Sequence, residues 1–352
     1  MKIASQTIQS ISVIKFVMAF FVIVAHTLCL NNMDNLIAST PIMKYCLNVA
    51  VPVFFIISGF LLFRKMNLRE HKVANKRIRK YLIKIFILYT VFYVLYSIIA
   101  WYVALKAGVS FGEFLGYQIR KFLFVGESAY SWALWYLHGL LLAVLIIWTL
   151  LKLFPKIKIW FFPVLAIIIW GIGCIAITLG SERLGNIPGY NTFIFLFERV
   201  QRNGIFTGFP FVAIGLYLSE IKHPNNVIGV LFLALGLGLG FLGMDFGRML
   251  SAVGVVIIAL NVNLKDRKIY SLLGFMSKWM FLLHMAFIFI YIVLIKGKTD
   301  TTLGGSGFGL FVFTLSCSLA SSFLIWIIDE KRNHLNNGNE DMCYKGKMRS
   351  TS

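Results

Sequence analysis

The stretch from Lys15 to His26 carries a cation near one end and a histidine near the other end of one apolar segment. At about 100° per residue, this spacing brings His26 to within about 20° of the Lys15 face, roughly 16 Å further along a helix. Ionisable side chains in a membrane helix are costly and usually mark a site. Because histidine is the commonest general base, we predict a functional His26, with a purely structural hydrogen-bonding role as the alternative.

Two further histidines fall inside apolar segments. His138 lies in WALWYLHG and His284 lies in MFLLHM. Proton transfer and hydrogen bonding between helices both fit these positions, and packing is favoured for His138, which follows Trp135 and Tyr136. No pair of these histidines has the i, i+3 or i, i+4 spacing of helical metal ligands, so we predict no metal site.

A stripe of cations precedes the third apolar segment, in KRIRKYLIK at 76–84. Arg77 and Lys80 are three residues apart and share one helical face, which Lys84 continues one turn on. Such a stripe either binds anionic lipid headgroups and sets topology or clamps a phosphorylated ligand. Lys15 strengthens the second interpretation, because it adds a cation at the same membrane edge.

A third candidate stretch is FERVQRNGIFTGFPFVAIG at 197–215. It places Glu198, Arg199 and Arg202 just before a run that enters the membrane through two glycines and Pro210. The charges fit a solvated loop, and the glycines and proline also fit a helix start that lines a cavity.

Composition defines the elements that must position these residues. The 352 residues are 59% hydrophobic and only 14% charged, with a mean hydropathy of +0.81. We predict an all-α, polytopic integral membrane bundle of about ten transmembrane helices. The apolar windows are 11–30, 42–63, 81–105, 132–151, 160–179, 203–219, 226–242, 246–261, 270–296 and 306–328. The net charge of +20 lies in the loops between them, so we predict the lipid bilayer, and no nucleic acid, as a partner.

Lysine and arginine counts orient the chain. With the N-terminus inside, the inner segments hold 21 of these residues and the outer loops and span edges hold 10. The positive-inside rule therefore predicts that both termini are cytoplasmic. We expect one membrane domain at 1–330 and a polar, disordered cytoplasmic tail at 331–352. Gly236 and Gly240 have GxxxG spacing, which predicts close helix packing.

Six sequence features together resemble the membrane-bound acyltransferase family 3, over about residues 8–330. They are Lys15 and His26 with ten positions between them, VPVFFIISGFLL at 51–62, Arg77-x-x-Lys80, LWYL at 134–137, RNGIFTGFPFVAIG at 202–215 and FLLH at 281–284. The resemblance implies that His26 is catalytic and that Lys15, Arg77 and Lys80 contact a cytoplasmic acyl-CoA donor. This sequence has lysine at 15 and 80, where the family usually has arginine, so the charge is kept while the bidentate geometry is lost.

The resemblance also implies a reaction. We expect transfer of an acyl group, most simply acetyl from acetyl-CoA, to a hydroxyl of a cell-envelope saccharide or lipid-linked glycan precursor at the bacterial cell membrane. Direct attack assisted by His26 and a covalent acyl-histidine relay both remain open. Ser58 or Tyr136 is nominated as the oxyanion donor. The alternative function is amino-acid (serine) uptake, as in the membrane domains linked to serine racemases, and a non-catalytic scaffold is a third possibility.

Overall fold

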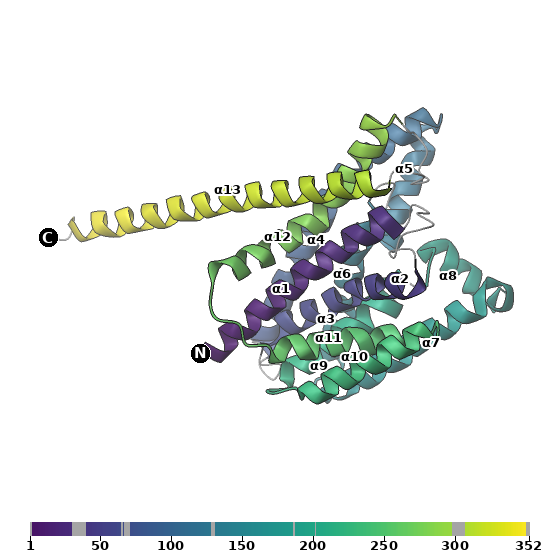
Figure 1. Ribbon diagram of the computed structural model, residues 1–352, viewed down its shortest axis with the longest axis horizontal. Helices are drawn as coiled ribbons and strands as arrows, with labels where there is room; N and C mark the ends of the chain where they lie inside the picture. Colours follow the sequence, from purple (N-terminus) through teal and green to yellow (C-terminus); the bar gives the residue numbers. More distant parts are fainter. Residues whose placement is uncertain are drawn as a thin grey trace.

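The part of the chain that the structure describes is helical and contains no strand. The computed structural model describes residues 2–29, 40–64, 66, 71–127, 131–185, 187–200, 202–297 and 307–349. The helices gather into one bundle, and the two termini lie on the same side of it, at the left of Figure 1.

Helices of very different lengths make up the bundle. In chain order they are α1 (Lys2–Val24), η1 (Ala25–Cys29), α2 (Pro41–Asn48), α3 (Ala50–Phe63), α4 (His71–Lys106), α5 (Phe111–Arg120), η3 (Lys121–Val125), η4 (Trp132–Leu134), α6 (Trp135–Leu153), α7 (Phe161–Leu184), α8 (Tyr190–Phe197), η5 (Gly204–Gly208), α9 (Phe209–Glu220), α10 (Asn226–Phe241), α11 (Gly247–Asn261), α12 (Lys268–Phe289), η6 (Ile290–Ile295) and α13 (Gly307–Arg349).

Seven helical stretches among the described residues are long and apolar enough to cross a membrane. They are Gln9–Thr27, Pro41–Phe63, Val73–Lys106, Trp132–Leu153, Phe161–Gly180, Lys268–Ile295 and Gly307–Arg332. Three shorter apolar stretches, Gly204–Glu220, Asn226–Phe241 and Gly247–Asn261, lie between the fifth and sixth of these. The polytopic helical membrane fold is thus confirmed. Each predicted window matches one stretch, although the sixth to eighth are shorter than an ordinary crossing.

Segments that sequence analysis left between the spans are also helical. α5 and α8 fall between predicted spans, and α4 begins at His71, inside the predicted 64–80 loop. The start of α5 has a local cause, because the Ser110 side chain accepts a hydrogen bond from Glu113 N while the Glu113 carboxylate accepts one from Ser110 N. This capping box satisfies two orphan donors. α13 continues to Arg349 across the predicted tail, whose side-chain surroundings lie outside the described part; its disorder stays a prediction.

π-helical turns interrupt three of the membrane helices. η1 continues α1, η5 precedes α9, and η6 continues α12. A π turn adds one residue to a helical turn and is frequent at functional sites. His26 lies in η1, and η5 begins two residues after Arg202. The spacing of 100° per residue therefore holds along α1 to Val24 and changes just before the histidine.

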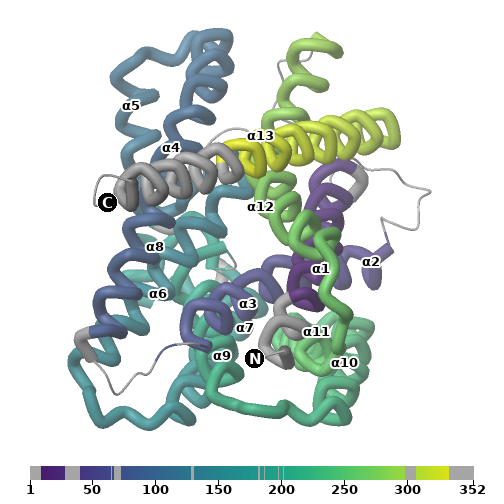
Figure 2. Tube along the Cα trace, turned by 90° about the vertical axis from the view of Figure 1, so that its left-hand side faces the viewer, coloured from purple at the N-terminus to yellow at the C-terminus, as the bar shows by residue number. Residues whose placement is uncertain are grey.

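Glycines bring several helices into direct backbone contact. α3 packs on α9, where a Cβ on Gly59 would overlap the Val212 carbonyl and one on Gly215 would overlap the Ile56 carbonyl. α10 packs on α11, where a Cβ on Gly236 would overlap Ser251. The close packing predicted from the Gly236 spacing is confirmed. α3 and α11 also contact α1, which packs beside α12 (Figure 2).

Candidate functional site

His26 lies near two aromatic rings at the C-terminal end of the first membrane helix. Its ring stacks on Trp132 at a centroid distance of 6.5 Å and an interplanar angle of 25°. The His284 ring from α12 lies 5.3 Å away between centroids. His26 Nδ1 is buried and has no hydrogen-bond partner among the described residues. Sequence analysis placed both histidines in the membrane but did not pair them.

His284 is held in one tautomer by its own helix. Its Nδ1 lies 2.8 Å from the carbonyl oxygen of Phe281 and 3.2 Å from that of Met280. Carbonyl oxygens only accept hydrogen bonds, so this nitrogen carries the proton and donates it. Nε2 of His284 is therefore an acceptor, and it too is buried without a partner among the described residues. Two complementary nitrogens, Nδ1 of His26 and Nε2 of His284, thus belong to neighbouring rings.

His138 has a different environment. Its Nε2 lies 3.0 Å from the Leu123 carbonyl oxygen, and its ring packs on Tyr89 at 5.7 Å. These contacts fit the packing interpretation. The described residues bring no group of three histidine, cysteine, aspartate or glutamate side chains together as a metal site.

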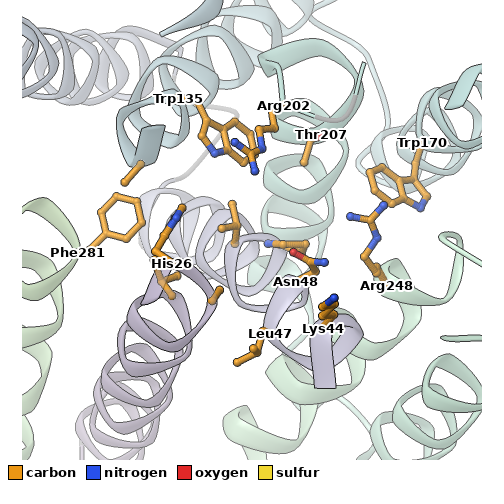
Figure 3. Close-up of a pocket in the computed structure, with 15 residues that line it drawn as sticks. His26, Lys44, Leu47, Asn48, Trp135, Trp170, Arg202, Thr207, Arg248 and Phe281 are labelled. Atoms are coloured by element: carbon orange, nitrogen blue, oxygen red, sulfur yellow. The ribbon is translucent and has the colours of Figure 1, made fainter. Parts of the chain in front are cut away.

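His26 opens onto a cavity of about 390 Å³, which we call the histidine cavity. α1, α2, α3, α6, α11 and the segment before α9 contribute to its wall (Figure 3). His26, Trp135 and Phe281 form one side of the view, and Arg248 with Trp170 forms the other. The lining residues are Val22, Ala25, His26, Lys44, Leu47, Asn48, Val51, Pro52, Ala133, Trp135, Trp170, Arg202, Thr207, Arg248 and Phe281. Its volume suits a small ligand.

The loop before α9 holds Arg202 at this cavity. Asn203 caps the turn, because its Oδ1 accepts hydrogen bonds from the backbone of Ile205 and Phe206, at 3.0 and 2.8 Å. Upstream, the Glu198 carboxylate accepts hydrogen bonds from Arg120 at 2.8 Å and Lys121 at 2.5 Å. Burial opposes ionisation of Glu198, but these two cations outweigh it and lower the pKa of the carboxyl. The solvated-loop interpretation of this charged stretch was therefore wrong for Arg202, which faces a cavity.

A second cavity, of about 560 Å³, contains the predicted donor contacts; we call it the lysine cavity. Lys15, Arg77 and Lys80 all line it, together with Lys84 and Lys278. Arg79, exposed on the adjacent face of α4, is not among its lining residues.

The lysine cavity is suited to an anion. Lys278 repels Lys15 and Lys84 electrostatically, so these cations converge from α1, α4 and α12. Lys278, which sequence analysis did not single out, comes from a helix distant in sequence. Convergent cations of this kind bind the phosphates of a ligand such as CoA.

Phe281 lines both cavities and therefore lies in the wall between them. Phe281 packs on Tyr136 at 5.2 Å and on Phe54 at 5.7 Å between ring centroids. The Tyr136 hydroxyl and Ser58 Oγ are 2.8 Å apart, and both residues line the lysine cavity. The two nominated oxyanion donors therefore form one hydrogen-bonded pair on the lysine-cavity side of this wall.

The helical bundle defines a polytopic membrane protein, and two cavities lie among its helices. Comparison with known families goes further. The model of the acyltransferase 3 family, described as "Acyltransferase domain", matches residues 8–327. The chain belongs to this family, as the sequence motifs indicated.

Two other comparisons give less. The chain is similar to a protein of Enterococcus faecalis named "Amino-acid racemase", at 26% identity over 205 residues. The matched region is 55% of this chain and 27% of the relative, so the chain corresponds to about a quarter of that protein. No solved structure matches significantly.

Proposed function

We propose that the protein is an integral-membrane acyltransferase. It transfers an acyl group, acetyl in the simplest case, from cytoplasmic acyl-CoA to a hydroxyl of a cell-envelope saccharide or lipid-linked glycan precursor. One observation carries this proposal: a cavity lined by Lys15, Arg77 and Lys80 and a cavity lined by His26 share the residue Phe281 in their walls. Family membership supports the reaction type.

The proposed topology has ten crossings and both termini in the cytoplasm of a bacterial cell. Lysine and arginine counts support this orientation, as does the position of both termini on one side of the bundle (Figure 1). In this orientation the lysine cavity faces the cytoplasm, where acyl-CoA is found. The histidine cavity, next to the start of α2, faces outward.

The donor site is assigned to the lysine cavity. Lys15, Arg77 and Lys80 hold the CoA phosphates, and Lys84 and Lys278 add to the positive potential. The acyl thioester supplies the reactive carbonyl carbon. Because Phe281 lines both cavities, it is the side chain that must move aside for the acyl end to reach His26. Ser58 or Tyr136 donates a hydrogen bond to the carbonyl oxygen as negative charge develops on it.

His26 is assigned as the general base. It removes the proton from the acceptor hydroxyl as the oxygen bonds to the acyl carbon, and it then returns that proton to the departing CoA sulfur. Nε2 must be free for this role, so Nδ1 must carry the proton. We assign Nε2 of His284 as the acceptor for this proton: the two rings lie 5.3 Å apart between centroids, and the hydrogen bond, which is not formed in this structure, forms as His26 takes up the second proton. His284 is then a positioning residue. Transfer through an acyl-histidine needs the same free nitrogen.

Acetyl-CoA binding to the detergent-purified protein tests the donor site. Arg77→Ala should weaken binding at least tenfold, because a charge-assisted phosphate contact is lost. Arg79→Ala is the matched control: it removes an equal charge from the same helix, outside the cavity, and should bind acetyl-CoA like the wild type. Equal weakening in both variants would contradict the assignment, because it would indicate nonspecific charge attraction.

A second function, uptake of an amino acid such as serine, is favoured by the similarity to the protein named "Amino-acid racemase". Proteoliposomes separate the two functions. If the wild type takes up labelled serine when acetyl-CoA is absent, and does not bind acetyl-CoA, the amino-acid uptake function is supported. Saturable acetyl-CoA binding without serine uptake would support the acyltransferase.

A further inference from the structure

Three cationic side chains line the histidine cavity in addition to His26. Its lining includes Lys44, Arg202 and Arg248 but no aspartate or glutamate among the described residues. Figure 3 shows Arg248 across the cavity from His26, and Lys44 on the Arg248 side of the view. This arrangement lies outside the donor site, whose cations line the other cavity. The proposed reaction, as stated, leaves these three cations without a role.

Arg202 is only loosely neutralised. Its guanidinium lies 3.8 Å from the Glu127 carboxylate, at the outer limit of an ion pair, and the facing Oε2 makes no hydrogen bond among the described residues. Burial raises the pKa of Glu127, and the nearby Arg202 opposes that rise. Arginine itself remains charged. Arg202 interacts electrostatically with His26, so it lies close to the proposed reaction centre.

Arg248 is fixed in place but keeps a free donor. It forms a 2.8 Å ion pair with Asp245 and packs over the Trp170 ring at 5.5 Å. Nε is buried and has no hydrogen-bond partner among the described residues. Trp170 is itself only 2% exposed. A buried N–H without an acceptor is costly, and a ligand oxygen would satisfy it. Lys44 has no ion-pair partner in the described part of the chain.

We propose that the acceptor is an acidic saccharide, whose carboxylate or phosphate is held by Lys44, Arg202 and Arg248 while its hydroxyl lies at His26. This inference rests on the acyltransferase proposal. Arg202 and Arg248 each have one carboxylate partner, but neither partner lines the cavity, so the cavity keeps an excess of positive charge. An anion would neutralise this charge and a neutral saccharide would not. Bilayer headgroups are the other source of anions. The position of Arg248 over buried Trp170 favours the saccharide, because a headgroup anchor would face the lipid.

Three sugars that differ at C6 provide the test: glucose, glucuronate and glucose 6-phosphate. Binding to the purified protein is measured by tryptophan fluorescence, in a neutral detergent without lipid, for the wild type, Arg248→Gln and Arg332→Gln. Arg332 is the matched control, because it pairs with Asp329 at the same i, i+3 spacing but is exposed, outside both cavities. Acetyl-CoA binding to the same preparations is measured in parallel.

The proposal expects glucuronate or glucose 6-phosphate to bind at least tenfold more tightly than glucose. The preferred anion identifies the acidic group as a carboxylate or a phosphate. Arg248→Gln should abolish this preference, and Arg332→Gln should keep it. Acetyl-CoA binding should be the same in both variants as in the wild type. Equal affinity for all three sugars, or no sugar binding while acetyl-CoA still binds, would overturn the acidic acceptor and leave the acyltransferase proposal standing. If anionic phospholipid vesicles bind the wild type but not Arg248→Gln, and the acidic sugars do not bind, the three cations are a site for lipid headgroups and the acidic acceptor is overturned. If the wild type does not bind acetyl-CoA, the acyltransferase proposal itself is refuted.

Discussion

Replacing His284 tests whether it orients His26 or only fills space. Asparagine at 284 can keep the hydrogen bond to the Phe281 carbonyl oxygen, which Nδ1 now makes at 2.8 Å. It cannot present an acceptor where Nε2 lies. Glutamine can place its amide oxygen near the Nε2 position and so can still accept a hydrogen bond from His26 Nδ1. The two variants therefore separate the roles of the two ring nitrogens of His284.

The magnitude follows from the bond that is lost. A hydrogen bond to a charged imidazolium contributes about 1.5 to 3 kcal/mol. If that bond forms only as His26 takes up the proton, its loss lowers kcat roughly 10- to 160-fold. His284→Asn should show this loss with an unchanged KM for acetyl-CoA, because His284 does not line the lysine cavity. His284→Gln should recover most of the rate.

The assay is acetyl transfer by purified protein in proteoliposomes, with thermal unfolding as the control for folding. Equal rates for asparagine and glutamine at 284, in folded protein, would refute the positioning role, whether both rates were normal or both were low. A change in KM for acetyl-CoA alone would also contradict it, because that result would relate His284 to donor binding.

Two further predictions concern stability and topology. Glu198→Gln should destabilise the protein at neutral pH; because the folded-state pKa of Glu198 is lowered, its stabilisation is present above the ordinary carboxyl pKa of 4.5 and is lost as pH falls through the lowered value. Thermal unfolding of the two proteins against pH should therefore converge in acid, and a constant difference would contradict the assignment to this carboxylate. Reporter fusions at Gly126 and Pro155 should report outside and inside respectively; the opposite pattern would exclude a cytoplasmic donor cavity.

From the sequence we could predict proximity only for residues that lie on the same face of one helix. Arg77 and Lys80 are three apart on α4, so their shared face follows from geometry alone, and both line the lysine cavity. Lys15 joins them because α1 packs beside the same space. Lys278 could not be added in this way, because only the packing of α1 on α12 brings it near Lys15.

The histidine cavity was largely beyond sequence reasoning. Lys44, Arg202 and Arg248 come from three separate elements, and no periodicity relates them. The signal that existed was residue type: a cation at the edge of an apolar segment is expensive and marks a candidate. The approach of His284 to His26 had the same weak signal. The π turn at His26 had no signal in the sequence, because one extra residue in a helical turn changes the direction of the side chain without altering the composition.

The central claim is that the acyl group passes from the lysine cavity to an acceptor at His26. The most direct test supplies radiolabelled acetyl-CoA to inside-out membrane vesicles that contain the wild type or His26→Ala, and measures label in the saccharide fraction together with acetyl-CoA binding. The account predicts that His26→Ala binds acetyl-CoA like the wild type and transfers no label. Transfer by His26→Ala at the wild-type rate would contradict it.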